Sequence, residues 1–489
     1  MKRKLNLKKM LALLAMVTTV FFAGLQVSQI GVEATSEKTY TIATDVTFPP
    51  FVYADENNEY VGIDISLMKE IAKVEGFKVK IQPVGFNAAI QSVQSGQVDG
   101  MIAGMTITND RKKTFDFSTP YYSSGIVMAV KPNSSVKGLD NLKGKKVAVK
   151  TGTSGADYAN SIKDKYGFKV VTFDDSDNMY NDVKSGNAVA CFEDSAVLSY
   201  GIKTGLALKI VTKPTATGNY GFAVKKGANQ ELLSKFNEGL KKLKANGTYD
   251  KIIKQYTGSE AISKQKANAT VDETTLSGIL KQNKSVLIKG LGQTIYLTIV
   301  GVILATIFGV LVGFLGVLPN GFARGLSATI IYIFRGLPLI VLALFIYNGV
   351  PNLTGNKIPA FVAGVITLAL NEGAYIAAFV KGGIESVDKG QMEAARSLGL
   401  PFGKAMRKVI LPQGIKLMIP SFVNQFIITL KDTSILSVIG LLELTQTGKI
   451  IIARNLQGFT VWGIIAVIYL IIITLLTLLS KIVERRLNR

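Results

Sequence analysis

The chemistry open to this 489-residue chain is limited first by the side chains that it lacks. It has no histidine, which excludes an imidazole base, a Ser/His/Asp triad and a histidine-containing zinc site. Its one cysteine, Cys191, can form neither an internal disulfide nor a tetrathiolate metal centre. We therefore expect no catalytic residues and no metal site, and a protein whose work is binding and movement.

ATP hydrolysis by this chain is not predicted either. The Gly-Lys pairs that end at Lys145, Lys404 and Lys449 are not followed by Ser or Thr, so none completes a phosphate-binding loop. We expect no cofactor to be bound by this chain itself.

Two features could interact with a charged ligand. Residues 151–155, Thr-Gly-Thr-Ser-Gly, lie between a strand-like run and a helical pattern, where free backbone N–H groups favour a carboxylate; many such turns, however, are only tight turns. Glu372 lies inside an apolar stretch long enough to span a membrane. A carboxylate is costly there and is a functional candidate by default. The alternatives are a buried structural pair or a local water cavity.

The elements that would position a ligand site lie between residues 37 and 257. Strand-like runs alternate there with helical patterns, the strands at 40–44, 79–84 and 146–150 and the helices at 65–75 and 156–166. This alternation predicts an α/β sheet. In such sheets small ligands bind where the carboxyl ends of strands meet the starts of helices.

The polar segments on either side of this region have different expected roles. Residues 1–34 combine a basic head with an apolar stretch too short for a stable span, which is typical of a secretory signal peptide cleaved before Thr35. A retained membrane anchor is the alternative. Residues 258–285 are polar and without clear periodicity, which predicts a linker that tethers the α/β domain to the carboxyl-terminal part of the chain.

The rest of the chain, residues 286–489, is predicted to be a transmembrane domain. Apolar stretches long enough to span occur at about 292–317, 327–349, 358–381, 408–430 and 458–481. The chain has a net charge of +22, which by itself would suggest a nucleic-acid partner. Half of that charge, 18 Lys and Arg against 7 Asp and Glu, lies in this most apolar region, largely between the apolar stretches. Membrane orientation explains it more simply than nucleic-acid binding.

The distribution of basic residues predicts the orientation in the cell membrane. Five spans with the amino-terminal domain outside place the carboxyl terminus in the cytoplasm. Eleven basic residues then lie inside against four outside, as the positive-inside rule expects. We therefore expect a multi-pass protein of the cytoplasmic membrane with an extracytoplasmic amino-terminal domain.

Four sequence blocks in the exported region resemble the extracytoplasmic binding proteins for polar amino acids, in that family's order. They are Ala-Thr-Asp-Val-Thr-Phe-Pro-Pro-Phe (43–51), Val-Gly-Ile-Asp-Ile-Ser-Leu-Met (61–68), Asp-Gly-Met-Ile-Ala-Gly-Met-Thr-Ile-Thr (99–108) leading to Arg-Lys-Lys, and Phe-Asp-Phe-Ser-Thr-Pro-Tyr-Tyr (115–122). The resemblance implies a two-lobed domain of the type II periplasmic-binding-protein fold. Lobe one would comprise residues 37–127 and 218–257, and lobe two residues 128–217.

The resemblance also implies a ligand site. Arg111 would clamp the ligand carboxylate, a role for which its planar fork is better suited than lysine, and Asp194 would bind the ammonium group. Backbone and hydroxyl contacts would come from Gly104, Thr106 and Ser154. The aliphatic stem would lie between aromatic walls made by Phe48 and Phe86. From the residues alone, Arg111 could equally belong to a solvated face, Asp194 could cap a helix, and the two phenylalanines could be core residues.

The identity of the amino acid is less sharply indicated. Asp45 and Lys150 resemble the glutamine-binding members of the family, in which the matching aspartate meets the side-chain amide. Glu193, however, stands where those members can carry a histidine. We expect glutamine, with glutamate, arginine or another polar amino acid as alternatives.

The segment 385–412 resembles the EAA loop of importer permeases of the ABC class. Glu393-Ala-Ala-Arg-Ser-Leu-Gly-Leu-Pro401 has that motif's spacing, with Glu393, Ala394 and Gly399 at the matching positions. In that family a short helix of this loop docks on the ATP-binding subunit and transmits its closure to the membrane helices. The resemblance implies a five-helix permease domain, a separate ATP-binding subunit that uses ATP and Mg, and a second copy of this chain.

Further permease-like segments occur at 290–298, 333–339 and 430–440. The family often has a glutamate at the position of Ala378, a few residues beyond Glu372, so a substrate site within the membrane stays open. The sequence thus predicts a fused receptor and permease of an ATP-driven amino-acid importer. A ligand-gated channel is disfavoured because no Thr-Val-Gly-Tyr-Gly filter occurs, and a soluble enzyme such as a dehydratase would leave the membrane half without a purpose.

Overall fold

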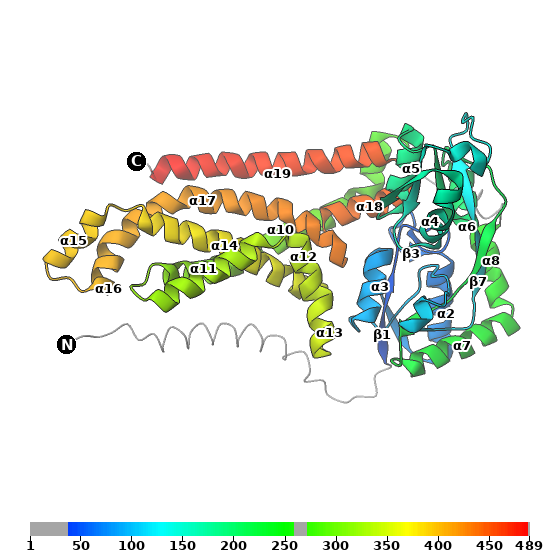
Figure 1. Cartoon of the computed structure of the whole chain (residues 1–489), viewed down its shortest axis with the longest axis horizontal. Helices are drawn as coiled ribbons and strands as arrows, with labels where there is room; N and C mark the ends of the chain where they lie inside the picture. The colour runs from blue at the N-terminus through cyan, green and yellow to red at the C-terminus, as the bar shows by residue number, and fades with distance from the viewer. Residues whose placement is uncertain (1–37, 259–270, 488–489) are drawn as a thin grey trace.

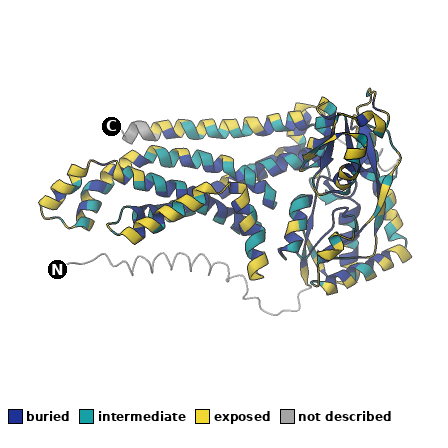
Figure 2. Cartoon of the chain, in the orientation of Figure 1, coloured by how far each residue is buried: buried dark blue, intermediate teal, exposed yellow. Residues whose placement is uncertain are grey.

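The computed structural model describes residues 38–258 and 271–487. The expected signal peptide and residues 259–270 of the expected linker lie outside the described residues. Figure 1 shows an amino-terminal α/β domain seated at one end of a bundle of long helices. The faces of those helices that point away from the bundle are largely exposed (Figure 2), as expected of surfaces that would meet lipid.

Lobe one is built on a five-stranded sheet in the order β4-β1-β5-β13-β6. The strands are β1 (Thr39–Thr44), β4 (Lys78–Pro83), β5 (Gly100–Met101), β6 (Phe115–Phe117) and β13 (Ala223–Lys225). β1 pairs in parallel with β4 and β5. The sheet is accompanied by the small hairpin β2 (Tyr53–Ala54) and β3 (Tyr60–Val61) and by the helices α2 (Ile63–Glu75), α3 (Phe86–Gln94), α7 (Gln230–Ala245) and α8 (Thr248–Thr257).

Lobe two is built on a second sheet, in the order β11-β7-β10-β8-β9, with β12 paired to β7. Its strands are β7 (Tyr122–Val130), β8 (Lys146–Lys150), β9 (Lys169–Phe173), β10 (Ala190–Asp194), β11 (Lys209–Ile210) and β12 (Thr215–Tyr220). Its helices are α4 (Ser154–Tyr166), α5 (Ser176–Ser185) and α6 (Ser195–Thr204). The strands at 40–44, 79–84 and 146–150 and the helices at 65–75 and 156–166 are confirmed to within a few residues.

The two lobes are joined by the antiparallel pair β7 and β12. The chain leaves lobe one through β7 and returns through β12, and Tyr122 is paired with Tyr220 where they enter. Because only these two strands cross, the lobes can rotate about the pair. Elsewhere they meet through contacts such as Asp45 with Lys150 and Thr106 with Ser154, and this boundary between the lobes is called the cleft below.

The membrane half consists of helices with short breaks. They are α10 (Leu276–Gly316), α11 (Gly321–Gly336), α12 (Leu339–Leu344), η4 (Phe345–Gly349), α13 (Val350–Thr354), α14 (Ala360–Glu385), α15 (Lys389–Ser397), α16 (Phe402–Ala405), η5 (Met406–Ile410), α17 (Leu411–Asp432), η6 (Thr433–Ile439), α18 (Leu444–Asn455) and α19 (Gly458–Leu487). Four helices of the described chain are long and apolar enough to cross a membrane, or five if a bent pair counts as one span.

The bent pair corrects the prediction of a continuous second span at 327–349. The chain turns by 99° between α11 and the segment Leu339–Thr354. The break falls at Leu337-Pro338, where proline provides no N–H for a helix and disfavours helical geometry in the residue before it. After the turn, the chain through α13 runs across the end of the helix bundle, beside α3 of lobe one (Figure 1).

The expected linker is also corrected at its carboxyl end. Residues 276–285 were predicted to be unstructured, but α10 begins at Leu276, where Thr275 caps it by accepting a hydrogen bond from the Gly278 N–H. The helix therefore projects beyond the apolar stretch toward the binding domain. Leu276, Ile279 and Leu280 have helical spacing in this first part, but five polar residues follow them and separate them from the apolar stretch.

Close packing of α10 against α14 depends on small residues. A Cβ atom added to Gly309 would lie 2.5 Å from the carbonyl oxygen of Gly373, and one added to Gly313 would lie 2.7 Å from that of Ala377. Only glycine permits this approach, which is how membrane helices commonly associate in the absence of a hydrophobic driving force. The pair forms a fixed centre against which α17 also packs.

Candidate functional site

A buried ion pair joins the two lobes at the base of the cleft. Lys150, the last residue of β8 in lobe two, donates from Nζ to Asp45, which follows β1 in lobe one. Asp45 also accepts from the backbone N–H of Thr47 at 3.0 Å and from its hydroxyl at 2.7 Å. Both charged side chains are only 2% exposed. Since charges this deeply buried need a partner, the pair forms where the lobes meet.

The pair shifts the pKa values of both groups. Burial opposes the charged form of Asp45, but the charge of Lys150 and the hydrogen bonds from Lys150 and Thr47 outweigh it, so the pKa of Asp45 is lowered. Burial likewise opposes the charged form of Lys150, but Asp45 outweighs it and raises the pKa of Lys150. Both groups are therefore charged at neutral pH.

Arg111 forms a second bridge between the lobes. Its Nη1 donates to the Thr106 carbonyl oxygen at 2.7 Å in lobe one, and its Nη2 donates to the Gly152 carbonyl oxygen at 2.8 Å in lobe two. The guanidinium carbon lies 5.7 Å from the centre of the Phe86 ring. Lys112, which follows Arg111 directly, is exposed. Arg111 thus does not belong to a solvated basic face, and its planar fork lies in the cleft.

The predicted turn at residues 151–155 does link a strand to a helix. It connects β8 to α4, and Thr153 caps α4 by accepting from the Ala156 N–H at 3.3 Å. Ser154, the first residue of α4, donates from its hydroxyl to the hydroxyl of Thr106 at 2.8 Å, across the cleft. The start of this helix therefore presents backbone donors beside Thr106 and Ser154.

Asp194 supplies the negative group opposite Arg111. It ends β10, is 5% exposed and accepts a hydrogen bond from the hydroxyl of Tyr220. Burial, followed by the nearby charge of Glu193, raises the pKa of Asp194 to about 7. Asp194 precedes α6, but its side chain makes no capping hydrogen bond, so it is not held there as a helix cap. A cationic group entering the cleft would restore its charged form.

Burial lowers the pKa of Arg111, while the charges of Asp157 and Asp194 oppose that shift. Besides the Asp45–Lys150 pair, the cleft therefore holds a cation, Arg111, and an acidic group, Asp194, whose charges influence each other. A zwitterion carries a carboxylate and an ammonium group, and it matches this pair of charges.

Phe48 and Phe86 belong to hydrophobic clusters and also line the cleft. Phe48 is 5% exposed and Phe86 is 6% exposed. Lys150 Nζ lies 5.7 Å from the Phe48 ring, as the Arg111 guanidinium does from Phe86. Each ring thus combines the two roles that the sequence left open, core residue and cleft wall.

Gly104, for which a backbone contact with the ligand is predicted, lies against Asp64 and Phe48. Its N–H donates to Asp64 at 2.8 Å and so is not directed at a ligand. Gly104 has a φ of +58°, and a Cβ atom there would lie 2.4 Å from the Phe48 ring. Gly104 therefore allows Phe48 to pack closely, and its predicted backbone contact with the ligand stays a prediction for its carbonyl oxygen.

Two residues of the site, Tyr220 and Thr47, were not singled out from the sequence, and Glu193, which was, has partners of its own. Tyr220 bonds Asp194, Thr47 bonds Asp45, and Glu193 accepts from the Ser176 hydroxyl at 3.0 Å and from the Asp194 N–H at 3.1 Å. Tyr220 comes from the returning strand β12, far along the chain from Asp194. Only the strand crossing brings them together.

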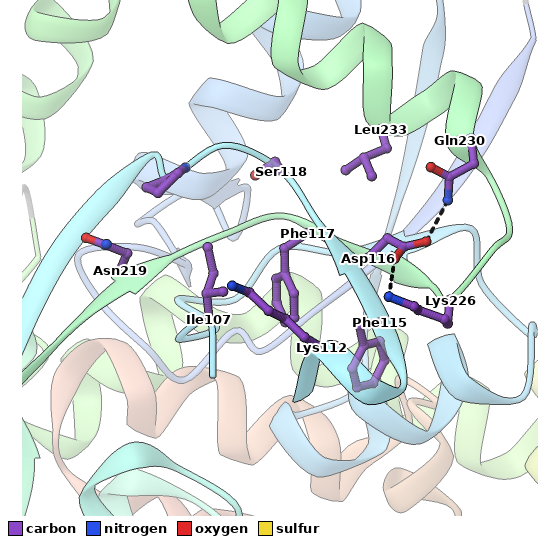
Figure 3. Close-up of a pocket in the computed structure, with 11 residues that line it drawn as sticks. Ile107, Lys112, Phe115, Asp116, Phe117, Ser118, Asn219, Lys226, Gln230 and Leu233 are labelled. Carbon is purple, nitrogen blue, oxygen red and sulfur yellow. Dashed lines mark hydrogen bonds and ion pairs between the residues drawn. The ribbon is translucent and has the colours of Figure 1, made fainter. Parts of the chain in front are cut away.

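A hollow of about 620 Å³ lies elsewhere and does not have this chemistry. It is lined by lobe one alone. Figure 3 shows its carboxylate, Asp116, bonded to Lys226 and Gln230, while Lys112 rather than Arg111 contributes to its wall. Because its carboxylate is already paired and the second lobe takes no part, the cleft is the better candidate.

Comparison with known proteins assigns both halves. Residues 40–259 match the bacterial extracellular solute-binding proteins of family 3, and residues 305–489 match the inner membrane component of binding-protein-dependent transport systems. The glutamine transport system permease protein GlnP of Escherichia coli K12 is 37% identical over 203 residues, which cover 41% of this chain and 93% of that protein. The chain belongs to the binding-protein-dependent transport permeases. Its solute-binding domain is part of the same polypeptide, and the family resemblance is confirmed.

Two solved structures are similar to the binding domain. An ancestral arginine-binding protein bound to glutamine is 43% identical, with 46% of this chain and 99% of that chain covered and a TM-score of 0.43. Substrate-binding domain 2 of GlnP from Lactococcus lactis, in an open conformation, is 45% identical, with 46% and 98% covered and a TM-score of 0.36.

The two family matches establish the general class of the protein. It is a membrane protein with an extracytoplasmic amino-acid-binding domain and a helical permease domain, and it is a transporter component rather than an enzyme.

The predicted coupling segment lies at the end of the permease farthest from the binding domain (Figure 1). Glu393 and Ala394 are exposed on α15. Gly399 follows that helix with a φ of +82°, a left-handed conformation that favours glycine. Leu398 is 84% exposed, which is unusual for a large apolar side chain next to polar residues and suits a surface that a partner covers.

Glu372 lies in the middle of α14 and is fully buried. Its Oε2 accepts from the Gln425 side chain on α17, whereas its Oε1 has no partner among the described residues. Gln425 is 2% exposed, and its backbone carbonyl oxygen accepts a hydrogen bond from the Thr429 hydroxyl at 2.8 Å. The structure therefore brings a carboxylate, an amide and a hydroxyl together between α14 and α17.

Arg111→Ala should strongly weaken amino-acid binding by the full-length chain. Removing one partner of a buried, hydrogen-bonded charge pair costs about 2–5 kcal/mol, which corresponds to a dissociation constant higher by about 30-fold or more. Isothermal titration would measure it. Lys112→Ala, which removes the exposed neighbouring cation, is the matched control and should leave the affinity unchanged. Equal affinities for both variants would place the carboxylate clamp elsewhere.

Amino-acid affinity should also depend on pH through Asp194. Its pKa is about 7 without ligand, and a bound ammonium group favours the carboxylate and lowers that pKa. Affinity should be full above pH 7 and decrease as the pH falls through about 7, by up to about tenfold per pH unit.

The measurement is titration in buffers from about pH 5.5 to 8.5, where binding near pH 7 should release protons. Asp177→Asn is the control, because burial, followed by the charge of Asp175, also raises the pKa of Asp177, to about 8. The variant should keep the pH dependence. A constant dissociation constant across this range would refute the assignment of Asp194.

Proposed function

We propose that this chain is the receptor and permease subunit of an ATP-driven importer that takes up glutamine. The observation that carries the proposal is the pairing of charges across the cleft. Arg111 and Asp194 match the two charges of a free amino acid, and the neutralised Asp45–Lys150 pair lies in the same cleft. A side-chain amide, which both donates and accepts, fits a site with a carboxylate and an ammonium group that are already balanced.

Glutamine is also supported by the relatives, since the E. coli protein similar to the permease half is a glutamine transport permease. Arginine is the second candidate, and a specific observation favours it. Glu193 is fully buried beside Asp45, and Lys150 is the one cation that affects the pKa of both carboxylates. Burial raises the pKa of Glu193, and a cationic side chain of the ligand would favour its charged form. Glutamate would meet two carboxylates and is disfavoured by charge.

The path for the ligand would pass the intramembrane group on α14 and α17. Glu372 has one carboxylate oxygen directed at no partner in the described chain, and Gln425 and Thr429 offer further polar atoms. Polar groups within a bilayer are costly and usually serve transport. Glu372 is therefore proposed to line the pathway.

The coupling loop would meet an ATP-binding subunit that uses ATP and Mg. α19 ends on the same side as α15 and α16, at the end opposite the binding domain (Figure 1). With the binding domain outside, this side faces the cytoplasm and carries the carboxyl terminus. The permease would have five spans, with the bent pair as one of them, and two copies of the chain would enclose the pathway.

Titration of the purified full-length chain with each of the twenty amino acids tests this function. Glutamine should bind more tightly than the other nineteen, because its side-chain amide satisfies both Asp45 and Lys150 without adding charge, and asparagine carries that amide on a shorter side chain. Tighter binding of arginine would instead support the second candidate, and no binding of any amino acid would refute the importer. The same titrations of the Asp45→Asn variant separate the affinity that comes from contacts with the ligand's side chain from the affinity that comes from Arg111.

Two variants should distinguish coupling to the ATP-binding subunit from movement of the ligand through the permease. In cells that also express the ATP-binding subunit, Glu393→Ala should reduce both labelled-glutamine uptake and ligand-stimulated ATPase activity, because it weakens the contact at α15. Glu372→Ala should reduce uptake while ATPase activity is still stimulated. Both should lose about tenfold in uptake and keep normal ligand affinity.

Glu385→Ala is the control for Glu372, since Glu385 ends the same helix and is exposed. Normal uptake by the Glu372 variant would argue that its pairing with Gln425 is only structural. Unchanged ATPase stimulation in the Glu393 variant would count against docking at α15.

A further inference from the structure

The binding domain contacts the permease half of its own chain mainly through lobe one. The first contact is the segment 345–358, which comprises the last part of the bent helix pair and most of the connection to α14. Gln97 of lobe one accepts from the Ile358 N–H at 3.0 Å and donates to the Ile358 carbonyl oxygen, so one amide pairs with both backbone groups of one residue. Lys357 Nζ lies 2.7 Å from Asp99 Oδ1.

Further bonds extend this contact. The side chain of Gln82, in β4, donates to the hydroxyl of the fully buried Tyr347. Asn348 donates to Gln91, in α3, at 3.2 Å. A Cβ atom on Gly440, after η6, would lie only 2.3 Å from the Val84 side chain. Lobe one therefore meets the permease at van der Waals distance over a continuous strip from β4 to α3.

The second contact centres on Arg454 of α18. Its guanidinium forms a two-bonded ion pair with Glu273, at 3.0 and 2.6 Å, and donates to Asn283 of α10 at 2.7 Å. It also donates to the Asp55 carbonyl oxygen and to Asn58, both at the tip of the β2–β3 hairpin of lobe one. One side chain thus joins α18, α10, the end of the linker and lobe one.

This Arg454 cluster is well buried. The side chains of Arg454 and Glu273 are 9% and 15% exposed. Ile450, one turn earlier on α18, belongs to the hydrophobic core of lobe one itself. Buried charge pairs and shared core residues are costly to separate, because each group would be left without its partner.

Lobe two meets the permease differently. Leu456, after α18, packs against the hydrophobic cluster of lobe two, and a Cβ on Gly458 would approach the Asn181 side chain to 2.9 Å. Beside this contact lies a hollow of about 440 Å³, lined by Tyr53 of lobe one, by Tyr180 and Thr204 of lobe two, and by Asp272 and Asn455. Lobe two thus meets the permease half through apolar packing beside this hollow, whereas lobe one makes the hydrogen bonds and ion pairs described above.

We propose that lobe one is the fixed seat of the binding domain on its own permease, and that lobe two is the part that swings to release the ligand. The inference rests on the proposed transport function, since it assigns the motion that delivers the ligand. The strand pair β7 and β12 is the hinge, and opening breaks the Lys150–Asp45 and Arg111–Gly152 bridges while the Arg454 cluster and the Gln97 contact remain.

Two cysteine pairs, each joined by a short bis-maleimide in the full-length chain, test the asymmetry. Asp99→Cys with Lys357→Cys ties lobe one to the permease, and Asn181→Cys with Gly458→Cys ties lobe two. Both are made in a Cys191→Ala background, since Cys191 is the one native cysteine. The probe is the dissociation rate of labelled glutamine.

Tying lobe one should leave the dissociation rate within about twofold, because that lobe does not move, whereas tying lobe two should slow it by about tenfold or more. Each variant before cross-linking is its own control for folding. A slow rate with lobe one tied, or an unchanged rate with lobe two tied, would overturn the proposal.

A third variant releases the seat. Adding Arg454→Ala and Gln97→Ala to the pair that ties lobe two should restore fast dissociation, because lobe one is then free to swing instead. Continued slow dissociation would mean that these residues are not the seat.

The yield of the cross-link gives a readout that needs no ligand. The lobe-one pair should react to completion with or without glutamine, and a low yield would also overturn the proposal. Failure of the uncross-linked chain to bind glutamine would instead refute the proposed substrate, while the yield would still report on the seat.

Discussion

The buried ion pair between Lys150 and Asp45 is the interaction on which the arrangement of the binding domain depends. Neither charge could be buried alone at a tolerable free-energy cost, and each is contributed by a different lobe. The two sheets must therefore approach for the pair to form, and it must be exposed to water or lost when they separate. Closure of the cleft and satisfaction of these charges are a single event.

The rest of the ligand site is arranged around this closure. Arg111 takes a carbonyl from each lobe, Ser154 reaches Thr106 across the gap, and the aromatic rings of Phe48 and Phe86 face cations. Every one of these contacts spans the cleft or lines it. A ligand that replaces the protein carbonyls on Arg111 with its own carboxylate gains a charge-assisted pair, which favours the closed state by its differential affinity for it.

Much of the binding domain could be predicted because its signals are local. The strand at 146–150, the glycine-containing turn and the helix after it are adjacent in sequence, and alternation of apolar residues with turn residues identifies such units. Arg111, Lys150 and Asp194 were predicted from motifs, and the structure brings all three to the cleft.

The contacts that sequence reasoning missed are those between distant segments. Tyr220 reaches Asp194 only because β12 returns beside β7, and the Gly104 N–H is directed at Asp64 by the packing of α2. The bend at Pro338 did have a local signal, since proline interrupts a helix. The apolar composition of residues 327–349 does not indicate the bend, because hydropathy shows how long an apolar stretch is and not whether its helix is straight.

Fusion of receptor and permease has a physical consequence that composition does not reveal. A flexible tether raises the effective concentration of the binding domain, yet leaves it free to leave the surface. Here Glu273, at the carboxyl end of the linker, pairs with Arg454, and Arg454 in turn holds the β2–β3 hairpin of lobe one. The linker thus ends at the Arg454 cluster, which is part of the contact between the binding domain and the permease half. Docking then costs little further chain entropy, because the last residues of the linker are already ordered against α10 and α18. The motion left to the domain is rotation of lobe two about its two strands, and release of the ligand requires no dissociation of the receptor.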